Sequence, residues 1–183
     1  MEVGRMKVKA GVMGSAGGKM SPRVRRKARR VGEALARHGC VIVTGGCPGY
    51  PEEATLGAKA AGGMTLGISP ALDVKEHVKR YGSPVRGTDV LIFTGAGLMG
   101  REVTAVRTCD VVIIIGGRSG TLGEFAIAYD EGKPIGVLEG SGGIAGVIPH
   151  VLKHIHKKTR SRVVFDRDPE KLVERLLAVY RGR

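Results

Sequence analysis

Residues 110–124, DVVIIIGGRSGTLGE, decide the fold of this chain. Five β-branched apolar residues, Val111 to Ile115, follow one another without a polar break, which is typical of a strand buried on both faces of a parallel sheet. Two glycines end the run, and a helical pattern begins near residue 121. Small residues let backbone N–H groups approach a ligand, and a helix N-terminus favours negative charge. We therefore expect a phosphate, as part of a nucleotide, at this turn.

Strands and helices alternate outward from this stretch along the whole chain. Predicted strands cover residues 7–13, 40–44, 64–68, 89–93, 111–115, 134–138 and 163–165. Predicted helices cover 22–38, 51–61, 100–108, 121–131, 143–157 and 168–180, with one helical turn at 73–80 inside an irregular segment. Repeated strand–helix units predict an α/β fold, with residues 1–183 forming a single domain around a doubly wound parallel sheet that has helices on both faces.

Glycine clusters follow the predicted strands, at the sheet edge where such folds bind ligands. The predicted phosphate or nucleotide contacts from the turn after the fifth strand are Gly117, Arg118, Ser119, Gly120 and Thr121. Those after the first and second strands are Gly14, Ser15, Gly17, Gly45 and Gly46. Gly95, Gly97 and Gly100 also form GxGxxG, but the next strand starts too soon and ends without the acidic residue of a dinucleotide site. We therefore do not expect a standard NAD or FAD site.

The composition indicates a compact chain and excludes several classes of function. Hydrophobic residues are 42% of the sequence, and no apolar run approaches the roughly 18 residues of a membrane span. Trp is absent and aromatic residues are 4%, so stacking platforms for single-stranded nucleic acid are scarce. The cysteines Cys40, Cys47 and Cys109 form no CxxC pair, and His154 and His156 do not share a helix face. We expect no disulfide framework, no metal site and a cytoplasmic location.

The net charge of +13 is concentrated in two runs, residues 23–30 (RVRRKARR) and 153–162 (KHIHKKTRSR). Such runs form surfaces that bind nucleic acid or attract phosphorylated ligands. The alternative is a solvated helix face. That alternative is favoured for the first run, because its apolar residues fall at helical spacing: Val24, Ala28, Val31 and Leu35.

Arg101, Asp110 and residues 116–124 together resemble the LOG-like (SLOG) group, once mislabelled as lysine decarboxylases. The signature of this group is PGGxGTxxE, preceded by an arginine in a Met-His-x-Arg-Lys segment. Superposing the Gly-Thr pair also aligns Gly117, Glu124 and, without a gap, Arg101. The resemblance implies a Rossmann-like fold. For the plant and bacterial LOG enzymes it implies hydrolysis of cytokinin nucleoside 5′-monophosphates to the free base and ribose 5-phosphate.

This chain departs from the signature at five positions. Where the family has His, Lys, Pro, Gly and a frequent Glu, the chain has Met99, Glu102, Gly116, Arg118 and Gly123. The substituted pattern is more similar to a sister branch that includes the molybdenum cofactor carrier proteins. That branch is more distantly related to DNA-processing protein A, which binds single-stranded DNA. Its members keep the fold and the phosphate loop but need not be hydrolases.

The resemblance implies catalytic roles for Arg101 and Glu124, on the phosphate or leaving base and on the ribose. Alternatively, Thr121 and Glu124 form a T-x-x-E capping box, which would make the carboxylate a helix cap, and Arg101 is a surface residue at a helix start.

Three hypotheses follow: a nucleoside monophosphate phosphoribohydrolase, a non-catalytic carrier or sensor of a phosphorylated ligand such as molybdopterin, and a DNA-binding protein. The first is favoured slightly over the second, and nucleic acid is not favoured. No cofactor is required. The expected partner is a phosphorylated small molecule, no membrane is expected, and the resemblance implies a homodimer or homotetramer.

Overall fold

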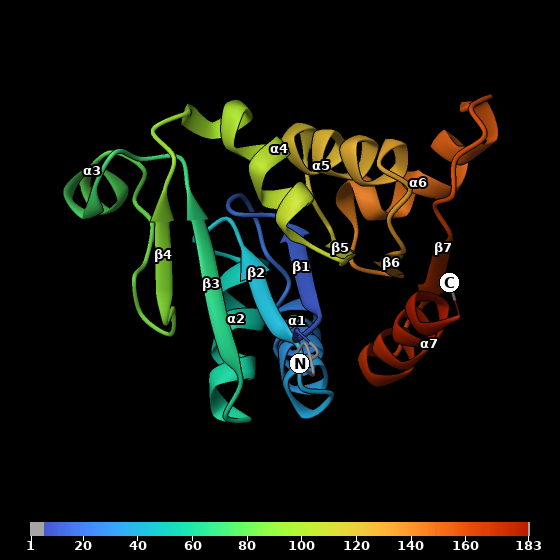
Figure 1. Ribbon diagram of the computed structural model, residues 1–183, viewed down its shortest axis with the longest axis horizontal. Helices are drawn as coiled ribbons and strands as arrows, with labels where there is room; N and C mark the ends of the chain where they lie inside the picture. Colours follow the sequence, from blue (N-terminus) through green and yellow to red (C-terminus); the bar gives the residue numbers. More distant parts are fainter. Residues whose placement is uncertain (1–5, 183) are drawn as a thin grey trace, which may run out of the picture.

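The computed structural model describes residues 6–182, so residues 1–5 and 183 of the predicted domain lie outside the described part of the chain. One sheet of seven parallel strands forms its centre (Figure 1). The strands are β1 (Lys9–Gly14), β2 (Val41–Thr44), β3 (Met64–Ser69), β4 (Val90–Phe93), β5 (Val111–Ile115), β6 (Ile135–Leu138) and β7 (Val163–Asp166). Their order is β4-β3-β2-β1-β5-β6-β7, which confirms the doubly wound α/β fold.

Helices cover both faces of the sheet. They are α1 (Pro22–Arg37), α2 (Tyr50–Ala60), α3 (Val74–Lys79), α4 (Gly97–Thr108), α5 (Ser119–Asp130), α6 (Gly143–His154) and α7 (Pro169–Arg181). Figure 1 shows α1, α2 and α7 on one face, α4, α5 and α6 on the other, and α3 beyond the β4 edge. The predicted segments are all present. The main differences are that α4 and α5 begin two or three residues earlier than predicted, which brings their first turns into the site.

The buried strand predicted at Val111–Ile115 is confirmed, since all five residues are 0% exposed. Its alternate side chains enter two cores. Ile113 packs with α1 and α7 on one face, and Ile114 packs with Phe125 of α5 on the other. Burying one such side chain stabilises the fold by roughly 1.5–3 kcal/mol. The β5 register is therefore strongly fixed, and with it the position of the turn that follows.

The basic run at residues 23–30 forms the outer side of α1, as the spacing of its apolar residues predicted. Arg25 and Arg29 both form ion pairs with Glu53 of α2, at 3.1 and 3.0 Å, and Arg30 pairs with Glu170 of α7. Three of the six basic side chains of this run are thus paired within the fold. No helix within residues 6–182 is long and apolar enough to cross a membrane.

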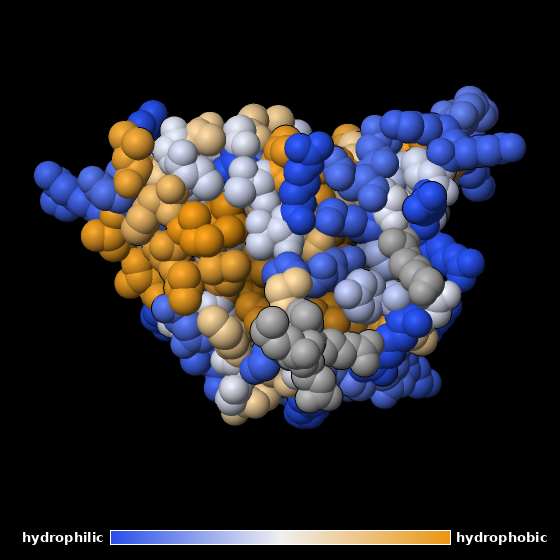
Figure 2. Space-filling view, viewed as in Figure 1, coloured by the Kyte–Doolittle hydropathy of each residue, from blue (hydrophilic) through white to orange (hydrophobic). Residues whose placement is uncertain are grey.

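An apolar surface lies over β3 and β4, on the face that carries α4 (Figure 2). We call the exposed residues Met64, Val90, Ile92, Met99 and Val103 the β4-side patch. Their exposed fractions range from 41% for Val103 to 67% for Met99. Val90 and Ile92 lie opposite Leu66 and Ile68 of β3 in the parallel register, so they share the face that holds the second core. The helices stop short of this edge, and the patch stays open to solvent.

Candidate functional site

A cavity of about 340 Å³ opens at the carboxyl ends of β1, β2 and β5. β1 has β2 on one side and β5 on the other. The helix that follows β1 covers one face of the sheet and the helix that follows β5 covers the opposite face, so the two loops leave in opposite directions. This divergence is the topological switch point at which doubly wound sheets bind ligands. Both predicted glycine loops, after β1 and after β5, meet there.

The turn after β5 is held in a shape that requires glycine. Gly116 and Gly117 have φ values of 62° and 102°, and a Cβ on Gly117 would lie 2.5 Å from the Thr121 side chain. The N–H of Gly117 donates to Ser15 Oγ at 2.8 Å, and the N–H of Gly116 donates to Ser141 Oγ at 2.9 Å. Their carbonyls accept from the first turn of α6. The turn is therefore fixed from three directions.

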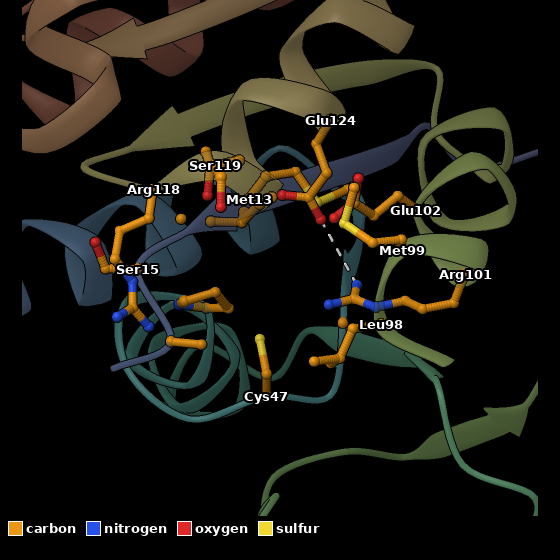
Figure 3. A pocket seen from close by; sticks show the side chains of 17 residues that line it. Met13, Ser15, Cys47, Leu98, Met99, Arg101, Glu102, Arg118, Ser119 and Glu124 are labelled. Atoms are coloured by element: carbon orange, nitrogen blue, oxygen red, sulfur yellow. Dashed lines mark ion pairs between the residues drawn. The ribbon is translucent and has the colours of Figure 1, made fainter. Parts of the chain in front are cut away.

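The first turn of α5 supplies donors to one end of the cavity. Arg118 is the N-cap residue, and its side chain makes no capping hydrogen bond. The amides of Ser119, Gly120 and Thr121 consequently have no partner inside the helix. These three residues, Arg118 and Ser15 line what we call the turn end of the cavity (Figure 3). An uncapped helix N-terminus that faces a cavity binds anions.

The α4 side chains Leu98, Met99, Arg101 and Glu102 line the opposite side, which we call the α4 end (Figure 3). The side chain of Glu124 comes from α5 and points toward Arg101. Arg101 Nη1 lies 3.6 Å from Glu124 Oε1, an ion pair too long for a hydrogen bond. Arg101 Nε and Nη1 are buried without any hydrogen-bond partner. A guanidinium with two unsatisfied buried donors has capacity for an acceptor from a ligand.

Burial changes the acidity of the α4 end. It raises the pKa of Glu124 from 4.5 to about 7; Arg101 opposes this shift and Glu102 adds to it. Burial also raises the pKa of Glu102, again opposed by Arg101. The thiol of Cys47, which lines the same cavity, has its pKa raised by desolvation. Two carboxyls around one guanidinium form a site whose net charge depends on pH. Within residues 6–182, no group of three or more His, Cys, Asp or Glu side chains is placed to hold a metal ion.

Most of the predicted site residues meet in this cavity. Those that line it are Arg101, Glu124, Arg118, Ser119, Gly120, Thr121, Gly14, Ser15 and Gly45. Gly17, Gly46 and Gly117 do not line it. Gly17 lies beside Arg118, Gly46 faces His77 and Leu91, and the amide of Gly117 is occupied by Ser15. Gly45, which directly follows β2, has a second role: a Cβ there would lie 2.2 Å from the Arg101 guanidinium.

The cavity residues that were missed as site candidates include Cys47, Leu98 and Glu102. Glu102 stood out in the sequence only as a departure from the LOG-like signature. Its position directly after Arg101 was the available signal. The early start of α4 at Gly97 places Leu98 in the wall, and the predicted start near residue 100 had hidden it.

The capping-box hypothesis for Thr121 and Glu124 is wrong. The N-cap of α5 is Arg118, so both residues lie inside the helix, and the Glu124 carboxylate points into the cavity instead of back to a cap amide. The alternative of a surface arginine is also wrong, since Arg101 is only 7% exposed.

Comparison with known proteins agrees with this architecture. The model of the SLOG cluster4 family matches residues 7–173. This chain belongs to that family. An uncharacterized protein from Archaeoglobus fulgidus is 36% identical over 129 residues, which cover 70% of this chain and 78% of the relative.

Solved structures place this SLOG protein near the cofactor-carrier branch. The X-ray structure of TM1055 superposes with a TM-score of 0.81, at 29% identity over 94% of this chain and 99% of the other. The molybdenum cofactor binding protein from Rippkaea orientalis gives a TM-score of 0.74, at 29% identity over 95% and 98% of the two chains. DNA processing protein A from Helicobacter pylori, at 21% identity, shares the fold with a TM-score of 0.61 over 93% and 80% of the two chains.

Proposed function

We propose that the cavity binds a nucleoside 5′-monophosphate, with its phosphate on the first turn of α5 and its ribose and base toward the α4 end. One observation carries this proposal: an uncapped helix N-terminus and a buried arginine with two unsatisfied donors face the same cavity. Both groups donate hydrogen bonds and bind an anion or a carbonyl oxygen. A phosphorylated ligand longer than a bare phosphate satisfies the two ends together.

The reaction supported by this placement is hydrolysis of the N-glycosidic bond. The oxygen of water bonds to the anomeric carbon, the bond from that carbon to the base nitrogen breaks, and the base leaves with a proton. Positive charge develops on the ribose in such a reaction. The ionised carboxylate of Glu124 would stabilise that charge, and Arg101 would hold the leaving base.

Incubation with AMP, CMP and GMP tests the activity, with chromatography for the free base and for ribose 5-phosphate. We expect base release from at least one nucleotide, and its loss in Glu124→Gln. Glu174→Gln makes the same chemical change on an exposed position of α7 and should leave the rate unchanged. If no nucleotide releases its base, the hydrolase proposal fails.

A non-catalytic carrier is the second candidate, and it has its own support. The R. orientalis protein, which is named for binding the molybdenum cofactor, matches nearly the whole chain. A carrier needs the turn end but no turnover. Native mass spectrometry of purified protein would show a co-purified molybdopterin-type ligand, together with nucleotide incubations that release no base. DNA binding is not proposed, because Trp is absent and aromatic residues are 4% of the chain, which leaves few stacking platforms for single-stranded nucleic acid.

We also propose that a second copy of the chain covers the β4-side patch. The five residues that define the patch are all apolar, in a chain whose net charge is +13. Two copies can therefore meet there without the charge repulsion that basic surfaces impose. Met99 belongs to the patch and lines the cavity, so such an interface would border the site. Light scattering should give at least twice the chain mass of 19.3 kDa. Val103→Lys should lower it, and a monomer at working concentration would exclude the interface.

A further inference from the structure

Arg101 and Glu102 are consecutive residues of α4, and both side chains reach the α4 end of the cavity (Figure 3). Arg101 presents two buried N–H groups without acceptors. Glu102 as a whole residue is 6% exposed. Within residues 6–182 its carboxylate makes no hydrogen bond or ion pair, and its oxygens are not fully buried. A donor group and a two-oxygen acceptor therefore line the same end of the cavity, and neither has a hydrogen-bond partner within residues 6–182.

Two glycines of α5 leave the space that the Glu102 carboxylate occupies. A Cβ on Gly120 would lie 2.9 Å from Glu102 Oε1, and a Cβ on Gly123 would lie 2.7 Å from Oε2. Both distances are shorter than side-chain atoms tolerate, so these positions must stay glycine for the carboxylate to lie there. The absence of side chains at Gly120 and Gly123 therefore lets the carboxylate lie against the first turns of α5, at the cavity.

A donor beside two acceptors complements one particular ring edge. Guanine presents an acceptor, a donor and a donor in order: O6, N1–H and the 2-amino group. Arginine donates to the carbonyl oxygen, and a carboxylate accepts from both N–H groups. Adenine presents a donor followed by an acceptor and does not match. The apolar side chains of Leu98 and Met99 line the same end and offer contact to the faces of a flat ring.

We propose that Arg101 and Glu102 together recognise the 2-amino-4-oxopyrimidine edge of the ligand ring, so that the cavity selects guanine-type over adenine-type ligands. This inference rests on the proposed function, since the phosphate at the turn end directs the ring toward α4. Pterin phosphates carry the same edge, and the test must separate them from guanine nucleotides. The competing role for Glu102 is structural: a carboxylate beside the first turn of α5, stabilised by the helix dipole.

Calorimetric titration at pH 8 with GMP, IMP and AMP tests the recognition, because IMP differs from GMP only in lacking the 2-amino group. We expect GMP to bind roughly tenfold or more tightly than IMP, and AMP more weakly than GMP, since an unpaired buried acceptor penalises the wrong ligand. Neopterin monophosphate is the second arm: tighter binding than GMP identifies a pterin as the natural source of the edge. Equal affinities for GMP and IMP in the wild-type protein would overturn the inference without any variant.

Glu102→Gln should remove the preference for GMP over IMP, because its amide N–H₂ faces a ring donor, while ribose 5-phosphate binding stays unchanged. Glu174→Gln is the matched control and should keep the preference. A lower melting temperature in Glu102→Gln with an unchanged GMP-to-IMP ratio would assign the structural role and overturn the recognition. Ribose 5-phosphate separates the two proposals: if it binds and no ring preference exists, only this inference fails. If it does not bind, the proposed function fails as well.

Discussion

The two ends of the cavity are built from different parts of the chain. The turn end consists largely of backbone, with Gly116, Gly117 and the free amides of the first turn of α5. The α4 end consists of the buried side chains of Arg101, Glu102 and Glu124. Backbone donors keep their partial charge at every pH. The charge of the α4 end changes with protonation, because burial raises the pKa of both carboxyls.

This difference indicates a division of labour. Helix N-terminal amides recognise any phosphate, so the turn end gives anchoring without selectivity. Donors and acceptors on side chains discriminate between rings and act on a reacting bond, so selectivity and chemistry belong to the α4 end. A substitution at one end therefore tests whether the binding or chemistry at the other end is independent of it.

The largest effect is expected from Glu124→Ala on the rate of base release. Losing one charged group that stabilises a transition state lowers the rate by roughly a hundredfold to a thousandfold. The affinity for ribose 5-phosphate, measured by calorimetry, should change little, because the turn end is intact. A parallel loss of ribose 5-phosphate affinity would show that the two ends are not separable.

Gly117→Val should break the turn end. Valine is strained at a φ of 102°, and its Cβ would meet Thr121 at 2.5 Å. We expect the free energy of unfolding to fall by about 2–3 kcal/mol in urea titrations, together with loss of ribose 5-phosphate binding. Gly146→Ala is the control, since that helical position of α6 has open space and ordinary backbone. An unchanged unfolding midpoint in Gly117→Val would mean that the turn adopts another shape.

The sequence predicted the turn end better than the α4 end, and the reason is local. The apolar run of β5, the two glycines and the start of α5 lie within 15 residues, so short-range rules apply to them. The same rules predicted the order of strands and helices. The contact between Arg101 and Glu124 joins two helices, and the position of Cys47 depends on β2 lying next to β1. No pattern of neighbouring residues predicts these tertiary contacts.

Residues that fit two local patterns were the ones predicted ambiguously. Thr121 and Glu124 satisfy the spacing of a capping box, and only the start of α5 at Ser119 removes that possibility. Gly45 fitted a ligand-contacting glycine, but its lack of a side chain also makes room for the Arg101 guanidinium. Tertiary packing decides between such alternatives, and the family resemblance supplied the residues that periodicity could not.

The pH dependence of the free energy of unfolding should report the protonation of Glu124 at the α4 end. The pKa of Glu124 is raised from 4.5 to about 7 in the folded state, so folding favours its protonated form. The corresponding stability is fully present below about pH 4.5 and is lost as the pH rises through 7. Glu124→Gln removes this loss and should make the protein about 2 kcal/mol more stable than wild type at pH 8, with little difference at pH 5. Parallel stability curves across this range would mean that Glu124 is ionised in the fold at every pH measured.

The smallest effect is expected from Arg118→Ala, the one charged side chain of the turn end. Arg118 is exposed, so its attraction for phosphate acts through solvent and is screened by salt. Ribose 5-phosphate affinity should fall by roughly threefold to fivefold at low ionic strength, and the difference should shrink in 0.5 M NaCl as the Debye length falls to roughly 4 Å. Lys75→Ala, an exposed cation on α3, is the control and should show no such change. The buried guanidinium of Arg101 is shielded from salt, so a loss of GMP affinity caused by Arg101→Ala should persist at both ionic strengths. If the Arg118→Ala effect proved larger and independent of salt, Arg118 would close over the bound phosphate, and the turn end would owe its affinity to a side chain rather than to the backbone.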